Sequence, residues 1–150
     1  MIVTFCGHSE VSQPEAVRRW LEDLLVALVE QGADTFYLGG YGAFDRLAAG
    51  VLRGCKARYP HLNIVLILPY LTGNRAADGY DDTIYPPLET VPPRVAVLRR
   101  NQWMVEQSDL LVAYVIHSWG GAAKTLDHAK RRRKPIVQYP ELTSFAGTIF

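Results

Sequence analysis

Short apolar runs alternate along the chain with longer segments in which apolar residues recur every three or four positions. The runs cover residues 2–5, 36–38, 63–69, 110–116 and 135–139, and their length and β-branched content predict buried strands. The longer segments begin near residues 14, 43, 101 and 121 and have the spacing of amphipathic helices. The pattern predicts a doubly wound α/β fold, with a mainly parallel five-stranded sheet in the order 3-2-1-4-5 and helices on both faces.

Several polar positions refine these boundaries. Ser12 and Glu15 have the spacing of a capping box, with Pro14 in the first turn that follows, and Gly32 is placed to end the same helix in a left-handed conformation. Residues 70–93 are rich in proline and glycine, which predicts an irregular segment that we interpret as a lid. Residues 94–98 are expected to form a short strand or extension, and residues 143–150 fit no element.

Three turns that contain glycine follow predicted strands, at residues 6–9, 39–45 and 118–124. The third leads directly into a predicted helix, whose first N–H groups lack partners within the helix and suit an anion. The carboxyl ends of parallel strands share one edge of the sheet, where such folds bind ligands. The sequence therefore predicts a phosphate site in the crevice between the first and fourth strands, with the second turn beside it.

These turns carry a resemblance to a known family. A Gly-His pair follows the first strand, Gly-Gly-x-Gly-x-Phe-Asp spans residues 39–45, Arg-Asn-x-x-Met-Val-x-x-Ser-Asp spans residues 100–109, and a Gly-Gly pair follows the fourth strand. In this order they resemble the SLOG superfamily, a Rossmann-like group that includes the DprA/Smf and lonely-guy proteins, and above all its small YpsA-like bacterial members. The resemblance implies that a nucleotide or nucleotide-derived ligand binds at the carboxyl ends of the strands.

The chain departs from that family at the third turn. Ala122 stands where the superfamily usually has threonine, so phosphate anchoring rests on backbone N–H groups, with Lys124 nearby. The phosphoribohydrolase members carry Pro-Gly-Gly-x-Gly-Thr-x-x-Glu, and this chain lacks the proline, that threonine and the glutamate.

The residues expected to bind the ligand lie in or beside the motifs: Gly7, His8, Ser9, Gly39, Gly40, Gly42, Phe44, Asp45, Arg100, Asn101, Ser118, Gly120, Gly121 and Lys124. The glycines either let a ligand approach the backbone or simply permit tight turns. Arg100 offers a two-pronged donor to phosphate, with surface solvation as the alternative. His8 is either a ligand contact and acid/base group or a polar residue of the sheet edge. One of Tyr70, Tyr80 and Trp119 is expected to stack on a base.

Composition bounds the function. The chain has 150 residues, 49% of them hydrophobic and 21% charged, with a formal net charge of +1, which predicts one globular domain over residues 1–150 without a membrane span. We expect a cytoplasmic protein, and a homodimer that pairs through the Trp20 side of the first helix. Cys6 and Cys55 fit neither a metal site nor a disulfide framework. We expect no metal and no cofactor. The basic residues 130–134 are expected to complement the negative end of a helix dipole.

Three functions follow from these features. The first is a binding module, a sensor or carrier of a nucleotide-derived ligand without chemistry of its own. The second is a hydrolase that cleaves the N-glycosidic bond of a nucleotide, for which Asp45 and Asp81 are the candidate carboxylates and Glu106 a poorer one. The third is binding of single-stranded nucleic acid, which residues 130–134 favour and the near-neutral net charge disfavours. Nucleic acid is therefore not the expected partner.

Overall fold

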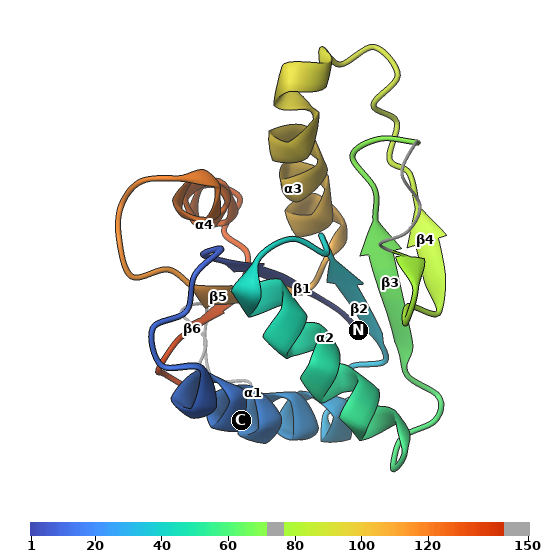
Figure 1. The fold of residues 1–150 in the computed structure, drawn as a ribbon, viewed down its shortest axis with the longest axis vertical. Coiled ribbons are helices and arrows are strands. Elements are labelled where there is room, and N and C mark those ends of the chain that lie inside the picture. Colours follow the sequence, from blue (N-terminus) through green and yellow to red (C-terminus); the bar gives the residue numbers. More distant parts are fainter. Residues whose placement is uncertain (72–76, 143–150) are drawn as a thin grey trace.

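Six parallel strands form one sheet in the order β4-β3-β2-β1-β5-β6 (Figure 1). The computed structural model describes residues 1–71 and 77–142. In chain order the strands are β1 (Ile2–Gly7), β2 (Thr35–Leu38), β3 (Asn63–Ile67), β4 (Asp82–Ile84), β5 (Leu110–Tyr114) and β6 (Ile136–Gln138). The predicted order of five strands is confirmed, with β1 at the centre between β2 and β5.

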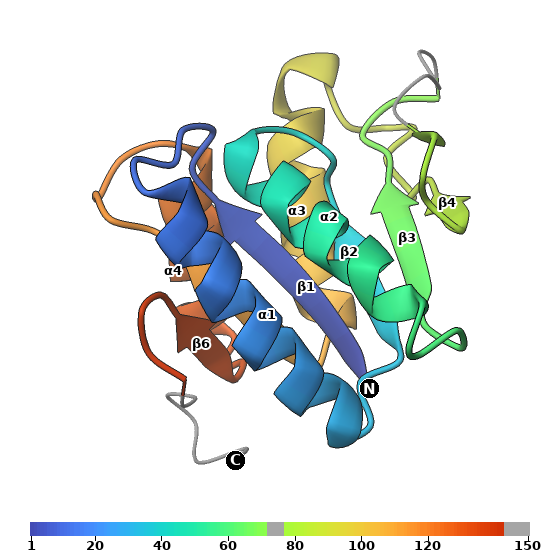
Figure 2. The ribbon, with the colours of Figure 1, turned by 60° about the horizontal axis from the view of Figure 1, so that its bottom comes forward.

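Two pairs of helices cover the sheet (Figure 2). Helices α1 (Pro14–Glu30) and α2 (Ala43–Lys56) pack side by side on one face, and α3 (Ala96–Gln107) and α4 (Gly121–Arg131) on the other. The larger core cluster includes the leucines of α1 and Phe36 of β2. A smaller cluster, which includes Val105 of α3 and Leu126 of α4, lies under the other pair of helices. The predicted doubly wound architecture is thus confirmed.

The sixth strand corrects the predicted five-stranded sheet. Strand β4 lies within the segment interpreted as a lid, of which residues 72–76 fall outside the described part of the chain. Asp81 fixes the start of this edge strand, because its backbone N–H donates to Ile64 O at 2.8 Å and its carboxylate accepts the Ile64 N–H at 2.8 Å. A strand of three residues with two polar side chains has no apolar run, so the pattern did not predict it.

Two further local expectations are wrong. Residues 94–98 form no strand, because a 3₁₀ turn over Pro93–Val95 leads directly into α3, and proline at a helix start presets the helical backbone angle. The Ser12–Glu15 capping box is also absent, since α1 begins at Pro14 after Gln13 without a side-chain cap. The left-handed Gly32 is confirmed, with φ at 107°.

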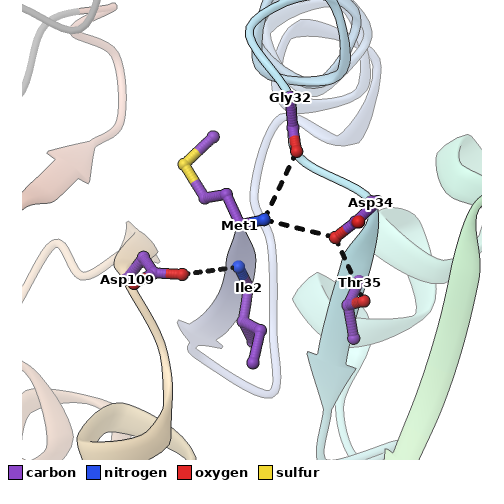
Figure 3. Close-up of polar contacts among 6 residues, drawn as sticks. All are labelled: Met1, Ile2, Gly32, Asp34, Thr35 and Asp109. Carbon is purple, nitrogen blue, oxygen red and sulfur yellow. Dashed lines mark hydrogen bonds and ion pairs between the residues drawn. The ribbon is translucent and has the colours of Figure 1, made fainter.

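The first strand is anchored at its start (Figure 3). The amino group of Met1 donates to Gly32 O at 3.3 Å and pairs with Asp34 at 3.3 Å, and the Ile2 N–H donates to the Asp109 carboxylate at 2.8 Å. The charged amino group lowers the pKa of Asp34. These contacts tie β1 to the starts of β2 and β5, so Asp109 braces the sheet.

Trp20 does not offer the free surface on which the homodimer was predicted. Its side chain is buried, its Nε1 donates to Glu141 O at 2.7 Å, and its ring packs edge-on against Tyr139. The chain's own segment after β6 therefore covers this side of α1. The homodimer stays a prediction, now without that surface.

The basic run at residues 130–134 is partly engaged with α3. Lys134 donates to the backbone carbonyls of Glu106 and Ser108 at 3.2 and 2.8 Å, and Arg132 pairs with the Glu106 carboxylate at 3.1 Å. Cations at the carboxyl end of a helix complement its dipole; Lys130 and Arg131 stand in the last turn of α4, as expected, while Lys134 and Arg132 reach the end of α3. Among residues 1–71 and 77–142, no helix is both long and apolar enough to cross a membrane.

Candidate functional site

A pocket of about 840 Å³ lies at the carboxyl ends of β1 and β5. The loop after β1, the first turn of α2, one side of α3 and the start of α4 form its walls. Strand β1 is the point from which the chain order runs outward in both directions, through β2 on one side and β5 on the other. The pocket therefore occupies the topological switch point, where open α/β sheets bind ligands.

The first turn is shaped by packing within the chain. An ideal Cβ on Gly7 would lie 2.3 Å from ring carbons of Phe44, so only glycine leaves room for that fully buried ring. Gly42, with φ at 92°, packs against Ser9, whose Cα would lie 2.8 Å from an added Cβ, and the Ala43 N–H donates to Ser9 O at 2.9 Å. The first two turns are thus joined to each other.

The second turn is occupied by side chains of neighbouring elements. A Cβ on Gly39 would lie 3.0 Å from the guanidinium carbon of Arg100, and a Cβ on Gly40, with φ at 74°, would lie 2.6 Å from Leu66. These glycines make room for the protein's own atoms. The sequence left open whether these glycines admit a ligand to the backbone or permit a tight turn. Close packing against Arg100 and Leu66 accounts for both of them.

Two buried side chains of opposite charge, Arg100 and Asp45, lie beside this turn. Arg100 is 4% exposed, donates from one terminal nitrogen to Ile67 O at 2.8 Å and Gly39 O at 3.2 Å, and donates from Nε to Asn101 Oδ1 at 2.8 Å. Burial raises the pKa of the Asp45 carboxyl to about 6, although the Arg100 charge and backbone N–H groups of the turn oppose this rise. Arg100 therefore stabilises buried carbonyl and carboxylate groups, and surface solvation does not describe it.

The third turn is open. Gly120 has φ at 94° and precedes α4, and an ideal Cβ on Gly121 would meet no atom within 4 Å. Gly120, Gly121 and Ala122 line the pocket, so the first turn of α4 faces free space with its unpaired N–H groups. A helix start of this kind attracts anions through those donors and through the helix dipole.

Three rings stack from the sheet edge toward solvent. The ring centroids of His8 and His117 lie 3.6 Å apart, with an angle of 14° between the ring planes. Those of His117 and Trp119 lie 4.0 Å apart, with an angle of 16°. His8 Nε2 accepts the Ile116 N–H at 2.9 Å, which requires a neutral ring with its proton on Nδ1. Burial, and then the neighbouring His117, lower the pKa of His8, so the neutral form is favoured.

The structure brings most of the expected residues to this pocket. Those that line it are Gly7, His8, Ser9, Asp45, Arg100, Asn101, Gly120 and Gly121. Gly39, Gly40 and Gly42 pack behind the wall, Phe44 belongs to the core, and Ser118 and Lys124 are exposed outside the lining.

The two other carboxylate candidates lie elsewhere. Asp81 pairs with Lys56 and holds the start of β4, and Glu106 pairs with His128 at 2.8 Å and with Arg132. Neither lines the pocket. Of the candidates named from the sequence, the pocket therefore includes only Asp45.

Sequence reasoning missed part of the lining. Tyr41, Val97, Ile116 and His117 all line the pocket. Ile116 and His117 follow β5, which ends at Tyr114, but the apolar pattern assigned residue 116 to the strand. The sequence did hold one signal for this part of the lining. His117 stands two residues before Trp119 in the turn, a spacing that allows the two rings to stack.

No protein-family model matches the chain. A curated relative, UPF0398 protein BH1768 of Halalkalibacterium halodurans, is 26% identical over 134 residues, which cover 79% of this chain and 69% of the relative. The DNA processing protein A of Helicobacter pylori, described with a single-stranded DNA binding mode, matches with a TM-score of 0.64 at 16% identity over 94% of this chain and 67% of that one. The molybdenum cofactor carrier protein of Chlamydomonas reinhardtii matches with a TM-score of 0.58 at 17% identity over 91% of this chain and 75% of that one.

The two solved structures share the fold, and the UPF0398 relative fits the small YpsA-like members of the group. Ligand binding and DNA binding are properties of those neighbours. The fold that the resemblance to the SLOG superfamily implied is thereby confirmed.

Proposed function

We propose that this protein binds a nucleotide or nucleotide-derived ligand in the pocket at the carboxyl ends of β1 and β5, as a sensor or carrier. The observation that carries the proposal is the open space over Gly121, where the first turn of α4 faces the pocket. Unpaired N–H groups and the positive end of the helix dipole meet there, which suits a phosphate. The fold shared with a cofactor carrier supports a binding role.

Calorimetry with the four ribonucleoside monophosphates tests this proposal. Gly121→Asp places a carboxylate where the phosphate would lie, so we expect binding to be lost, while an acidic residue in the first helical turn leaves α4 stable. Gly50→Asp is the matched control, because it adds the same charge at an exposed position of α2 with no atom near the added Cβ. No binding of any nucleotide, or equal affinity in wild type and Gly121→Asp, would contradict the proposal.

A second candidate is hydrolysis of the N-glycosidic bond of such a ligand. Asp45 favours it, because this carboxylate lines the pocket and burial raises its pKa to about 6, within the range that general acid–base catalysis uses. Cys6 also lines the pocket, but burial raises the pKa of its thiol, which disfavours the nucleophilic thiolate. Incubation with the same nucleotides should release free base, and Asp45→Asn should stop it. Intact nucleotides after prolonged incubation with folded protein would exclude this activity.

A further inference from the structure

The rim of the pocket concentrates exposed hydrophobic side chains. Trp119 is 69% exposed, Tyr41 78%, Ile116 61% and Val97 43%, and all four line the pocket. Exposed apolar groups gathered around a concave site mark a place where something binds. The phosphate proposed above accounts for none of them, so this rim points to an apolar part of the ligand.

The ring stack ends in a free aromatic face. His8 and His117 are packed against each other, and Trp119 covers the outer side of His117. The Nδ1 atom of His117 has no hydrogen-bond partner among the described residues, so stacking rather than hydrogen bonding orients this ring. Trp119 has one face on His117 and a large exposed surface, which leaves a flat platform two residues before Gly121.

The charges of the lining limit the anion. Glu10, Asp45 and Arg100 are the charged side chains among the described lining residues, and the buried Arg100 interacts electrostatically with Asp45. Glu10 then leaves the lining slightly negative. The start of α4 provides about half a positive charge, which attracts one phosphate at that point. Each further phosphate of a polyphosphate chain or a nucleic-acid backbone would meet a described lining whose one cation, Arg100, is buried.

We propose that the ligand carries one planar heteroaromatic ring, which stacks on the exposed face of Trp119, and one phosphate, which binds at Gly121. This inference rests on the proposed function and narrows it to nucleoside monophosphates and ligands of the same build. Stacking recognises any base by its flat face, so the larger purine rings bind more tightly than pyrimidines. Trp119 is then the residue that makes the pocket bind a nucleotide more tightly than a sugar phosphate without a base.

The test compares AMP with ribose 5-phosphate by calorimetry. Wild type should bind AMP roughly ten-fold more tightly, and Trp119→Ala should lose about that factor for AMP while its affinity for ribose 5-phosphate is unchanged, as expected for one base on one aromatic ring. Trp119→Phe should keep most of the difference. Tyr70→Ala is the control, because Tyr70 is a half-exposed aromatic outside the pocket lining.

The outcomes separate the two proposals. Equal affinity of wild type for AMP and ribose 5-phosphate, or an equal loss of both in Trp119→Ala, overturns the stacking inference while phosphate binding stands. Binding of neither probe overturns the proposed function and the inference with it. ATP should bind no more tightly than AMP, and a gain of ten-fold or more would overturn the limit to one phosphate.

Discussion

Replacing Gly7 by alanine tests whether the glycine of the first turn is required by packing. The added Cβ would lie 2.3 Å from two ring carbons of Phe44 and 2.6 Å from its Cβ. Phe44 is fully buried and stacked on Tyr114, with ring centroids 5.7 Å apart, so the ring has no free direction in which to move. Overpacking a core costs about 1–3 kcal/mol, and this overlap with a rigid ring places Gly7→Ala near the upper end.

Urea denaturation followed by circular dichroism measures this cost. About 3 kcal/mol corresponds to a fall in Tm of roughly 6–12 °C for a domain of this size. Phe44→Leu removes the ring, and in that background Gly7→Ala should cost less than about 1 kcal/mol, since the two sites are coupled. Gly121→Ala is the matched control: its Cβ meets nothing within 4 Å, so its stability should change by no more than about 0.5 kcal/mol.

Two results would refute the reasoning. If Gly7→Ala is as stable as Gly121→Ala, Phe44 does not require the glycine, and access of a ligand to the backbone becomes the better explanation. If the penalty persists in the Phe44→Leu background, its source is the backbone conformation rather than the ring.

Three further perturbations follow from the polar contacts. Asp45 binds its proton more tightly in the folded state, where its pKa is about 6 against an ordinary value of 3.8. The free energy of unfolding should therefore fall, by at most about 3 kcal/mol, as the pH rises from 4 to 6. Asp45→Asn should flatten this pH dependence in urea titrations, and an unchanged dependence would contradict the prediction. Asp109→Ala removes the acceptor of the Ile2 N–H and should cost about 1 kcal/mol, measured by the same denaturation; no loss would show that water replaces the carboxylate. Acetylation of the Met1 amino group should raise the pKa of Asp34 in an NMR titration, because that amino group lowers it; an unmoved pKa would contradict the ion pair.

Much of the fold could be predicted because the central strands are buried on both faces. Residues 110–114 and 63–67 are nearly continuous apolar runs, and α1 repeats leucines and valines at helical spacing. Strand β4 has no such run and depends on the tertiary contact of Asp81 with Ile64. Its existence was therefore invisible to periodicity.

The site was predictable in position but less so in detail. Parallel strands bring their carboxyl ends together, so the three turns had to meet at one edge. Which glycine faces a ligand and which faces Phe44, Arg100 or Leu66 depends on side chains distant in sequence. From the sequence Arg100 was expected to bind phosphate, with surface solvation as the alternative, yet its position in α3 brings its guanidinium to the carbonyl of Ile67.

The contact between Gly42 and Ser9 fixes one side of the pocket. The loop after β1 and the start of α2 share a backbone hydrogen bond from Ala43, so this side is preorganised and a ligand orders little there on binding. The opposite side, residues 115–120, is joined to it by the Ile116 N–H on the His8 ring. We therefore expect amide hydrogen exchange to slow on ligand binding in residues 115–120 and the first turn of α4, while the Ala43 amide, protected beforehand, changes little.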